Sequence, residues 1–445
     1  MRPYYNPIMF NQTFDGVDLK RHIIGTYYLE DPLPGDDPID HLSLVQSLAF
    51  EGSTGTWEEV KEHSEEVVKS LSGKVVGYYQ IPSPDNVKRA VIQLAFPIDA
   101  WQTNVPMMLL SVAGNCFAYS NRLRFLDVFF PPDLLKEFQG PKFGISGIRE
   151  KMGIFGRPLS LHIIKPKMGM TPDQTAKQVY ETALGGVDMV KDDEMTSDVY
   201  NSKMEDRLTA VMEALDKAKS KTGKEVIYFV SITDEADKVL EKAKRAVKLG
   251  ANGLLLAYSA GPSLLRVLAE DPEINVPILL HPSHMIALTP SIAWPAMAKI
   301  CRICGADLML TPCYWSTIPL VSHEEGIRTA QVKLAPLGHI KRTWPMPAAG
   351  MYPGLVPVLV REFGPDIVIP AGGGMLGHPT GYQAGARAWQ QAIEATMQGI
   401  PLEEAAKTKK ELKAALEKWG VLERPEVRWF RASPKYYPRP LKFES

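Results

Sequence analysis

One stretch of the sequence places a lysine directly before three acidic residues: Lys191, Asp192, Asp193 and Glu194. On an extended strand alternate side chains point the same way, so we expect Lys191 and Asp193 to share a side and Glu194 to follow as the chain turns. An amine that has reacted with CO₂ becomes a carbamate, and a carbamate with two carboxylates offers the hard oxygen ligands that suit Mg²⁺. The alternative interpretation is a solvated run of charges.

A second pair of basic residues, Lys165 and Lys167, flanks Pro166. Positive charge close to a lysine favours its neutral amine, which is the form that a lysine needs to move protons near neutral pH. The alternative is two surface lysines on either side of a proline that ends a strand.

A third motif is the glycine-rich segment Gly372-Gly373-Gly374-Met375-Leu376-Gly377-His378. Glycines leave backbone N–H groups unobstructed, and the start of a following helix adds partial positive charge, so the segment could cradle a phosphate. A turn that uses glycine only for its tight geometry is the alternative.

These motifs follow short apolar runs that alternate with longer helical patterns from about Ser160 onward. Most runs are continuously apolar, as expected for parallel strands that are buried on both faces. Eight such units over roughly 300 residues predict a closed (β/α)₈ TIM barrel, which places its chemistry at the carboxyl ends of the strands. The expected strands are 159–166, 186–193, 226–233, 253–258, 276–282, 307–312, 339–350 and 366–374, of which the Pro-rich seventh has the weakest pattern.

The segment before about Leu135 has a different pattern, with strand-like stretches such as HIIGTYYLE, KVVGYYQIP and AVIQLAFPI and a helical stretch around 57–71. We interpret it as a separate α+β domain of ferredoxin-like type. The predicted organisation is an α/β protein with an N-terminal domain at 1–140 and a barrel domain at 141–445.

Composition excludes several classes of protein. The 445 residues are 45% hydrophobic and carry a formal net charge of -1, so no long-range field draws the chain to nucleic acid or anionic lipid. The first residues show no basic segment before an apolar run, and no stretch of about 18 uncharged apolar residues occurs, so we expect a cytoplasmic protein without a membrane span. Cys301 and Cys304 form a C-x-x-C on a predicted amphipathic helix, which favours buried thiols over a zinc site.

Taken together, the motifs resemble the large subunit of ribulose-bisphosphate carboxylase/oxygenase. The resemblance rests on IIKPKMGM, GGVDMVKDDE and GGGMLGHP, with EGSTGTW in the first domain, and runs in order through nearly the whole chain. It implies that Lys191 is the carbamylated lysine and that Asp193 and Glu194 are its companion Mg²⁺ ligands. It also implies that Lys165 handles the substrate proton, with Lys167 as its neighbour.

The resemblance also implies a phosphate site and a shared active site. Gly350, Gly372 and Gly373 match phosphate-binding backbone positions. Residues that this family supplies from the N-terminal domain of a second subunit are matched by Glu51, Thr56, Trp57 and Asn115. The expected functional unit is therefore a homodimer with two shared sites, and higher oligomers of that dimer remain open.

Departures from the family pattern point away from CO₂ fixation. Carboxylases carry a lysine on the loop after strand six that holds the incoming CO₂, whereas Thr311–Gly326 contains no lysine. The His-x-Arg-type cluster after strand five is replaced by 281–284, with sequence HPSH, where His281 remains a candidate substrate-binding residue, and Ala348 replaces a serine. Charge-assisted contacts are worth about 1.5–3 kcal/mol each, so losing several should abolish tight bisphosphate binding.

We therefore interpret the chain as a RuBisCO-like enzyme that uses Mg²⁺ to enolise a small phosphorylated ketose or keto acid, with isomerisation or decarboxylation as related outcomes. The resemblance implies a lysine base at the position of Asn115 in the methionine-salvage enolases, so its absence weighs against that substrate. Three alternatives stay open: a true carboxylase, a metal-free aldolase with Lys165 or Lys191 as a Schiff base, and a catalytically silent sugar-phosphate binder.

Two further histidines, His284 and His323, could act as acid or base groups near neutral pH. The simpler interpretation of each is a loop histidine that makes a hydrogen bond.

Overall fold

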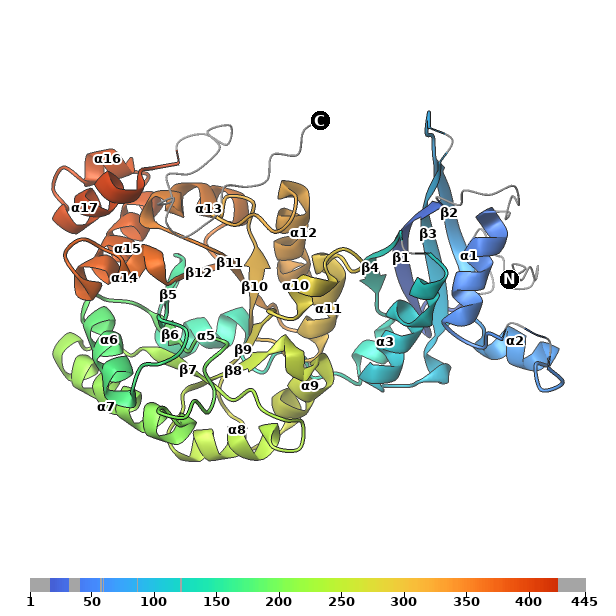
Figure 1. Ribbon diagram of the computed structural model, residues 1–445, viewed down its shortest axis with the longest axis horizontal. Coiled ribbons are helices and arrows are strands. Elements are labelled where there is room, and N and C mark those ends of the chain that lie inside the picture. The colour runs from blue at the N-terminus through green and yellow to red at the C-terminus, as the bar shows by residue number, and fades with distance from the viewer. Residues whose placement is uncertain are drawn as a thin grey trace. The chain divides into compact units, whose positions relative to one another are not determined.

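The computed structural model of the protein describes residues 17–31, 41–56, 58, 60–85, 87–120 and 122–422. These residues form two compact units. The first unit holds the described residues up to Gly140 together with His284–Cys304 and Pro336–Ile340. The second unit holds the other described residues, and Figure 1 shows it as a ring of helices around a set of strands.

The first unit is built on a four-stranded antiparallel sheet with the order β2-β3-β1-β4. Along β1 the residues from Gly25 to Glu30 alternate between buried and half-buried, as expected for a sheet with one covered face. Its elements are β1 (His22–Asp31), α1 (His41–Glu51), α2 (Glu65–Leu71), β2 (Lys74–Ile81), β3 (Lys88–Pro97), η2 (Ile98–Ala100), α3 (Val105–Ala113), η3 (Asn115–Ala118), β4 (Leu123–Phe129), α4 (Pro132–Leu135), α10 (Met285–Leu288) and α11 (Trp294–Ile303).

The second unit contains an eight-stranded parallel sheet with the order β11-β10-β9-β8-β7-β6-β5-β12. The terminal strands β11 and β12 lie in contact, so the sheet curves into a barrel. Its strands are β5 (Leu159–Ile163), β6 (Met189–Lys191), β7 (Ile227–Ser231), β8 (Gly253–Ala257), β9 (Ile278–His281), β10 (Leu308–Pro312), β11 (Trp344–Ala348) and β12 (Val368–Ala371).

Helices follow the strands around this barrel, as the ring in Figure 1 shows. They are α5 (Gly144–Met152), α6 (Pro172–Leu184), α7 (Met204–Thr222), α8 (Val239–Lys248), η4 (Tyr258–Ala260), α9 (Pro262–Glu270), α12 (His323–Leu334), η5 (Pro353–Leu355), α13 (Val356–Phe363), α14 (Gly373–Leu376), α15 (Tyr382–Met397), α16 (Leu402–Ala405) and α17 (Lys410–Trp419).

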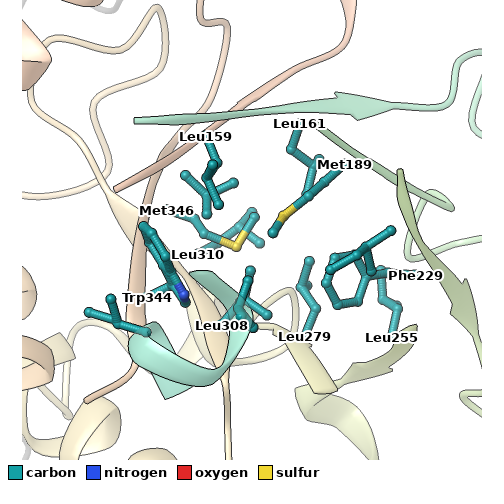
Figure 2. Packing of buried hydrophobic residues seen from close by; sticks show 14 residues of the cluster. Leu159, Leu161, Met189, Phe229, Leu255, Leu279, Leu308, Leu310, Trp344 and Met346 are labelled. Atoms are coloured by element: carbon teal, nitrogen blue, oxygen red, sulfur yellow. The ribbon is translucent and has the colours of Figure 1, made fainter. Parts of the chain in front are cut away.

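The barrel interior is a packed hydrophobic cluster to which every strand contributes. Figure 2 shows side chains such as Leu161, Met189, Phe229 and Met346 directed toward one another from different strands. Alternate strand residues supply this cluster, because a strand presents every second side chain to the same face. The interior is therefore filled, and ligands must bind at the ends of the strands.

Helix α5 contributes Ile145 and Ile148 to the same cluster. Asp307 fixes the start of this helix: its Oδ1 accepts hydrogen bonds of 2.7 Å from the backbone N–H groups of Phe143 and Gly144. Burial raises the pKa of the Asp307 carboxyl to about 6, although these backbone donors favour its ionised form.

The predicted fold class is confirmed, since an antiparallel α+β unit and an eight-stranded parallel barrel are both present. The seventh strand, which had the weakest sequence pattern, is β11. It contains Pro345 and Pro347, and it pairs with β10 along one side only, which is the position where a strand tolerates residues without an N–H donor.

Two details differ from the sequence expectation or sharpen it. The helix expected around 57–71 begins only at Glu65, because Ser64 caps its start by accepting a hydrogen bond from the Val67 N–H. The cysteines of the C-x-x-C are buried thiols at the end of α11, as predicted.

Within the described residues, no helix combines the length and the apolar character that crossing a membrane requires.

The buried carboxylate of Asp188 connects β5 to β6 at the end of β6 opposite to the predicted site. Asp188, immediately before β6, is fully buried and accepts hydrogen bonds from Arg157 and from both the backbone and the hydroxyl of Ser160. The Nζ of Lys224 lies 2.7 Å from its Oδ1. Burial opposes ionisation of Asp188, but Arg157 and Lys224 outweigh that effect and lower its pKa to about 2.

We predict that Asp188→Asn lowers the free energy of unfolding by about 3 kcal/mol at pH 7, because two cations lose their buried partner. The lowered pKa means that the contribution is complete above the usual value of 3.8 and is lost as the pH falls through about 2. Urea unfolding curves at several pH values measure both effects. Glu213→Gln, at an exposed pair with Lys217 on α7, is the control and should change stability by less than about 0.5 kcal/mol. Equal effects of the two substitutions on the free energy of unfolding would contradict the stabilising role of Asp188.

Candidate active site

The predicted site residues of the barrel lie at the carboxyl ends of its strands. Lys165 and Lys167 follow β5, Lys191 is the last residue of β6, and His281 is the last residue of β9. Gly372 follows β12. Strands β12, β5 and β6 are direct neighbours in the sheet, so the three sequence motifs meet at one edge of the barrel.

The side chain of Lys191 is completely buried. Its Nζ donates a hydrogen bond of 2.8 Å to the backbone oxygen of Asp192 and lies 3.5 Å from Oε2 of Glu194. Burial lowers the pKa of Lys191, with a smaller contribution from the charge of Lys165, while Glu194 and Asp193 oppose the shift. The environment therefore increases the share of neutral amine, which is the form that reacts with CO₂.

Lys165 reaches across from β5 to the end of β6. Its Nζ makes an ion pair with Oδ2 of Asp193, whose side chain is fully buried. The other carboxylate oxygen of Asp193 accepts a hydrogen bond of 3.2 Å from the Met195 N–H. One third of the Lys165 side chain stays exposed, so the ammonium group joins a buried carboxylate at an accessible edge of the barrel.

Glu194 is surrounded by basic groups. Its Oε1 lies 3.6 Å from Nζ of Lys167, and its Oε2 lies 3.3 Å from Nε2 of His281. Burial and the charge of Lys191 lower the pKa of His281 to about 3, so this ring is neutral at neutral pH. The Nδ1 of His281 is buried and has no hydrogen-bond partner among the described residues.

Asp192 points away from this cluster, as the alternation of the strand requires. It is fully buried and accepts hydrogen bonds from the guanidinium of Arg207, from the hydroxyl of Tyr228 at 2.6 Å and from the Ser231 N–H at 2.9 Å. The sequence interpretation treated the acidic run as one motif and missed this anchor. Strand alternation was the signal that separates Asp192 from its two neighbours.

The loops after β5 and β6 are tied to each other. The hydroxyl of Thr196 donates a hydrogen bond to the backbone oxygen of Lys167, and the Nδ2 of Asn201 donates one of 3.0 Å to the backbone oxygen of Gly169. These contacts fix the loop that carries the two lysines against the loop that carries the two carboxylates.

The glycine-rich segment packs directly against Lys165. A Cβ on Gly372 would stand 3.2 Å from Cε and Cγ of Lys165, and a Cβ on Gly374 would stand 1.9 Å from the backbone oxygen of Met351. A Cβ on Gly373 would meet nothing within 4 Å. The segment is therefore fixed on both sides and open in the middle, beside the Lys165 side chain.

Gly350 lies on the neighbouring loop after β11 and has a φ of 64°. A Cβ there would stand 1.5 Å from Oγ1 of Thr317, and the Thr317 N–H donates a hydrogen bond of 3.1 Å to the Ala349 oxygen. Glycine is required at this position by both the backbone conformation and the close approach. The segment after β10 is thereby held against the segment after β11.

The segment 313–322 joins β10 to α12 and contains no lysine. It carries an aromatic group in which the rings of Tyr314 and Trp315 lie 4.9 Å apart and both contact His323. The Nε2 of His323 lies 2.7 Å from Oε2 of Glu362, in agreement with the simpler interpretation of this histidine. His284, the second lower-ranked histidine, precedes α10 and is exposed.

The predicted residues of the first unit that the structure describes make local contacts within that unit. Glu51 ends α1, and its Oε2 accepts a hydrogen bond of 3.0 Å from the Tyr119 hydroxyl at the end of η3, the short helix that Asn115 begins. The Thr56 hydroxyl donates to the backbone oxygen of Glu58 at 3.0 Å. Trp57 lies outside the described residues.

The donor set at the ends of β5 and β6 fits a divalent cation of the Mg²⁺ type. Asp193 and Glu194 supply carboxylate oxygens, and Lys191 is a buried amine with a lowered pKa. A lysine carbamate together with a divalent cation carries the same formal charge as one ammonium group, so the surrounding charges need not change. No group of three or more His, Cys, Asp or Glu residues suited to a metal occurs in the described parts of the chain.

Comparison with known proteins identifies the family. Residues 144–419 match the catalytic domain of the ribulose bisphosphate carboxylase large chain, and residues 15–134 match its N-terminal domain. A ribulose bisphosphate carboxylase-like protein from Archaeoglobus fulgidus is 40% identical over 86% of this chain and 90% of its own length. The 2,3-diketo-5-methylthiopentyl-1-phosphate enolase from Geobacillus kaustophilus is 34% identical over 90% of this chain and 98% of its own.

Solved structures agree with this assignment. The octameric Rubisco from Pyrococcus horikoshii superposes with a TM-score of 0.82 at 32% identity, covering 91% of this chain and 96% of that chain. Dimeric as well as octameric Rubiscos share the fold, and enzymes of this superfamily use Mg²⁺ and a carbamylated lysine in general. Both domain matches, the relatives and the geometry at the barrel edge lead to one conclusion: the chain belongs to the ribulose bisphosphate carboxylase large-chain family, as a RuBisCO-like protein.

Proposed function

We propose that this protein enolises a phosphorylated ketose or keto acid with the help of Mg²⁺ and without productive CO₂ fixation. The observation that carries the proposal is the convergence of Lys165, Lys191, Asp193 and Glu194 at the ends of β5 and β6. Relatives named enolases, 33–35% identical to this chain, support enolisation as the reaction class.

The metal ligands in this proposal are the Lys191 carbamate, Asp193 and Glu194. When bound there, Mg²⁺ polarises a substrate carbonyl and stabilises the negative charge of the enolate. The buried position of Lys191 and Asp193 keeps water from competing for these groups, which strengthens electrostatic interactions at the site.

The residues of the chain have separate tasks in this reaction. Lys165 moves the proton on the substrate carbon, and the Lys191 carbamate is the alternative base. The ammonium group of Lys167, and that of Lys165 once it has taken the proton, stabilise negative charge on the substrate. The open position at Gly373, together with Gly372 and Gly350 on neighbouring segments, receives the phosphate.

Carboxylation is disfavoured by the segment after β10. The first lysine beyond β10 is Lys333 on α12, and it is fully buried. Its Nζ donates hydrogen bonds to the backbone oxygens of Met309 and Leu310 at 3.0 and 3.1 Å, so it is anchored to the barrel wall. It therefore cannot replace the mobile cation that holds CO₂ in carboxylases.

We also propose that the working unit is a homodimer in which Glu51, Thr56, Trp57 and Asn115 of one subunit complete the active site of the other. Support comes from the matched N-terminal domain and from the dimeric and octameric assemblies among solved structures of this fold. We place the enzyme in the cytoplasm, where its small phosphorylated substrate would be formed.

A metal-free aldolase is the second candidate, because the lowered pKa of Lys191 also suits a Schiff-base nucleophile. Reduction by borohydride in the presence of substrate, with activity that survives EDTA, would support that reaction. We expect the opposite result, namely loss of activity in EDTA and no trapped adduct.

Exchange of the substrate proton with solvent tests the proposed enolisation. With Mg²⁺ and bicarbonate, the protein should incorporate solvent deuterium next to the carbonyl of 2,3-diketo-5-methylthiopentyl 1-phosphate or of another ketose monophosphate, as followed by mass spectrometry. Lys165→Met should lower the rate about 10²- to 10⁴-fold because the proton-transfer group is removed. Lys191→Ala should lose both turnover and Mg²⁺ dependence, while the exposed Lys217→Ala control should match wild type. A wild-type protein that exchanges no tested substrate would be a silent binder.

A carboxylation assay tests the expected lack of CO₂ fixation. Incubation with ribulose 1,5-bisphosphate and labelled bicarbonate should give no labelled 3-phosphoglycerate, because the segment 313–322 has no lysine to hold CO₂. An authentic carboxylase run in parallel controls the assay. Labelled product at a rate above background would restore the carboxylase alternative.

Gly373 and Gly374 are adjacent glycines that serve as a matched pair for substitution. Gly374→Ala should lower the free energy of unfolding by about 1–3 kcal/mol, because its Cβ would collide with the Met351 oxygen. Gly373→Ala should change it by less than about 0.5 kcal/mol, since the added methyl meets open space. If Gly373 lines the phosphate site, the same substitution should nonetheless raise KM. Thermal unfolding and steady-state kinetics separate the two effects, and an unchanged KM in Gly373→Ala would remove that residue from the phosphate site.

A further inference from the structure

Lys165 lies just beyond the end of β5, where its peptide groups have left the sheet ladder. The last ladder contact nearby is the Ile164 N–H, which donates a hydrogen bond of 3.1 Å to the Lys191 oxygen. The N–H and C=O of Lys165 need other partners because they are close to the buried wall of the barrel.

One side chain supplies both partners. Gln178 on α6 is 4% exposed, and its Oε1 accepts a hydrogen bond of 3.2 Å from the Lys165 N–H. Its Nε2 donates a hydrogen bond of 2.7 Å to the Lys165 oxygen. The side-chain amide therefore pairs with Lys165 as a neighbouring strand would, at the residue where β5 has ended.

A histidine on β5 fixes the orientation of this amide. Nε2 of His162 lies 3.1 Å from Oε1 of Gln178, and Nδ1 lies 3.0 Å from Oγ1 of Thr182. Burial lowers the pKa of His162 to about 3, so the ring is neutral. Because the Gln178 oxygen only accepts, His162 must carry its proton on Nε2 and accept from the Thr182 hydroxyl at Nδ1. Rotating the Gln178 amide by half a turn would place its N–H donors against the Lys165 N–H.

We propose that Gln178 is a positioning residue for Lys165: its amide, oriented by His162, holds the Lys165 peptide so that the ammonium group stays at Asp193. The inference builds on the proposed proton-transfer role of Lys165. In this proposal, a residue on α6, outside the barrel, positions the Lys165 side chain at the carboxyl ends of the barrel strands.

The test replaces the amide while keeping the length of the side chain. Gln178→Met removes both hydrogen bonds to Lys165, and Gln174→Met, an exposed position on the same helix whose amide accepts from the Thr171 N–H, is the matched control. Gln178→Met should lower kcat for deuterium exchange about 10- to 100-fold with KM changed less than about threefold, because a misplaced reacting group slows chemistry more than binding. The control should leave both constants near wild type.

Gln178→Glu is the second variant, for use if Gln178→Met does not fold. Its carboxyl group can donate to the Lys165 oxygen only when protonated, so the deficit in kcat relative to wild type should shrink as the pH falls. A loss of stability alone would not produce this dependence. A deficit that is independent of pH, or equal losses in kcat and substrate affinity, would overturn the positioning role.

A readout without turnover separates this inference from the proposed function. Brief acetylation with acetic anhydride, followed by mass spectrometry, reports the reactivity of Lys165 relative to the exposed Lys217 in the same sample. Release of the Lys165 peptide should raise its relative acetylation at least about threefold in Gln178→Met and leave it unchanged in Gln174→Met. If wild type exchanges no substrate but this shift occurs, the proposed function fails and the positioning contact stands. Unchanged acetylation in Gln178→Met would refute the contact itself.

Discussion

The structure depends on keeping charged groups inside a hydrophobic barrel at the point where two strands end. Lys191 and Asp193 have no exposed surface, and taking either charge out of water alone would be costly. The cost is reduced because the two belong to one cluster: Lys165 pairs with Asp193, and Glu194 lies between Lys167, Lys191 and His281. A site of this kind favours a ligand or modification that preserves the charge balance, which is what a carbamate with a divalent cation does.

The same contacts that stabilise the barrel also orient the proposed reacting groups. Asp188 joins β5 to β6 below the site, and Asp192 joins the end of β6 to α7 through Arg207. With Asp192 fixed outward, strand alternation turns Lys191 and Asp193 toward the barrel edge. On the other side, Gln178 connects α6 to the residue after β5. Packing outside the barrel thereby determines geometry at its mouth, as preorganisation requires.

Much of the fold follows from local sequence patterns. Continuous apolar runs identified the barrel strands, and period-two alternation placed Lys191 and Asp193 on one side. Polar residues at the carboxyl ends of the runs then located the candidate site, because parallel strands end at a common edge. The strand assignments hold because each depends on residues that are close in sequence.

The contacts that were not predicted join residues far apart in sequence. Nothing in the pattern of α6 marks Gln178 as the partner of Lys165, since the contact depends on how the helix packs against β5. The pairing of Asp192 with Arg207 has the same origin. The prolines of β11 weakened its strand pattern, and only the sheet order shows that they occupy an unpaired side. Long-range packing, not local propensity, decides such features.

The central claim is that Lys191 becomes an oxygen ligand by reacting with CO₂. Carbon NMR of the protein with ¹³C-labelled bicarbonate and Mg²⁺ tests it directly, because a carbamate carbon bound to the protein gives a resonance distinct from bicarbonate. The account predicts this resonance in wild type, its retention in Lys165→Met, and its loss in Lys191→Ala. Absence of the resonance from wild type, or its persistence in Lys191→Ala, would contradict the account.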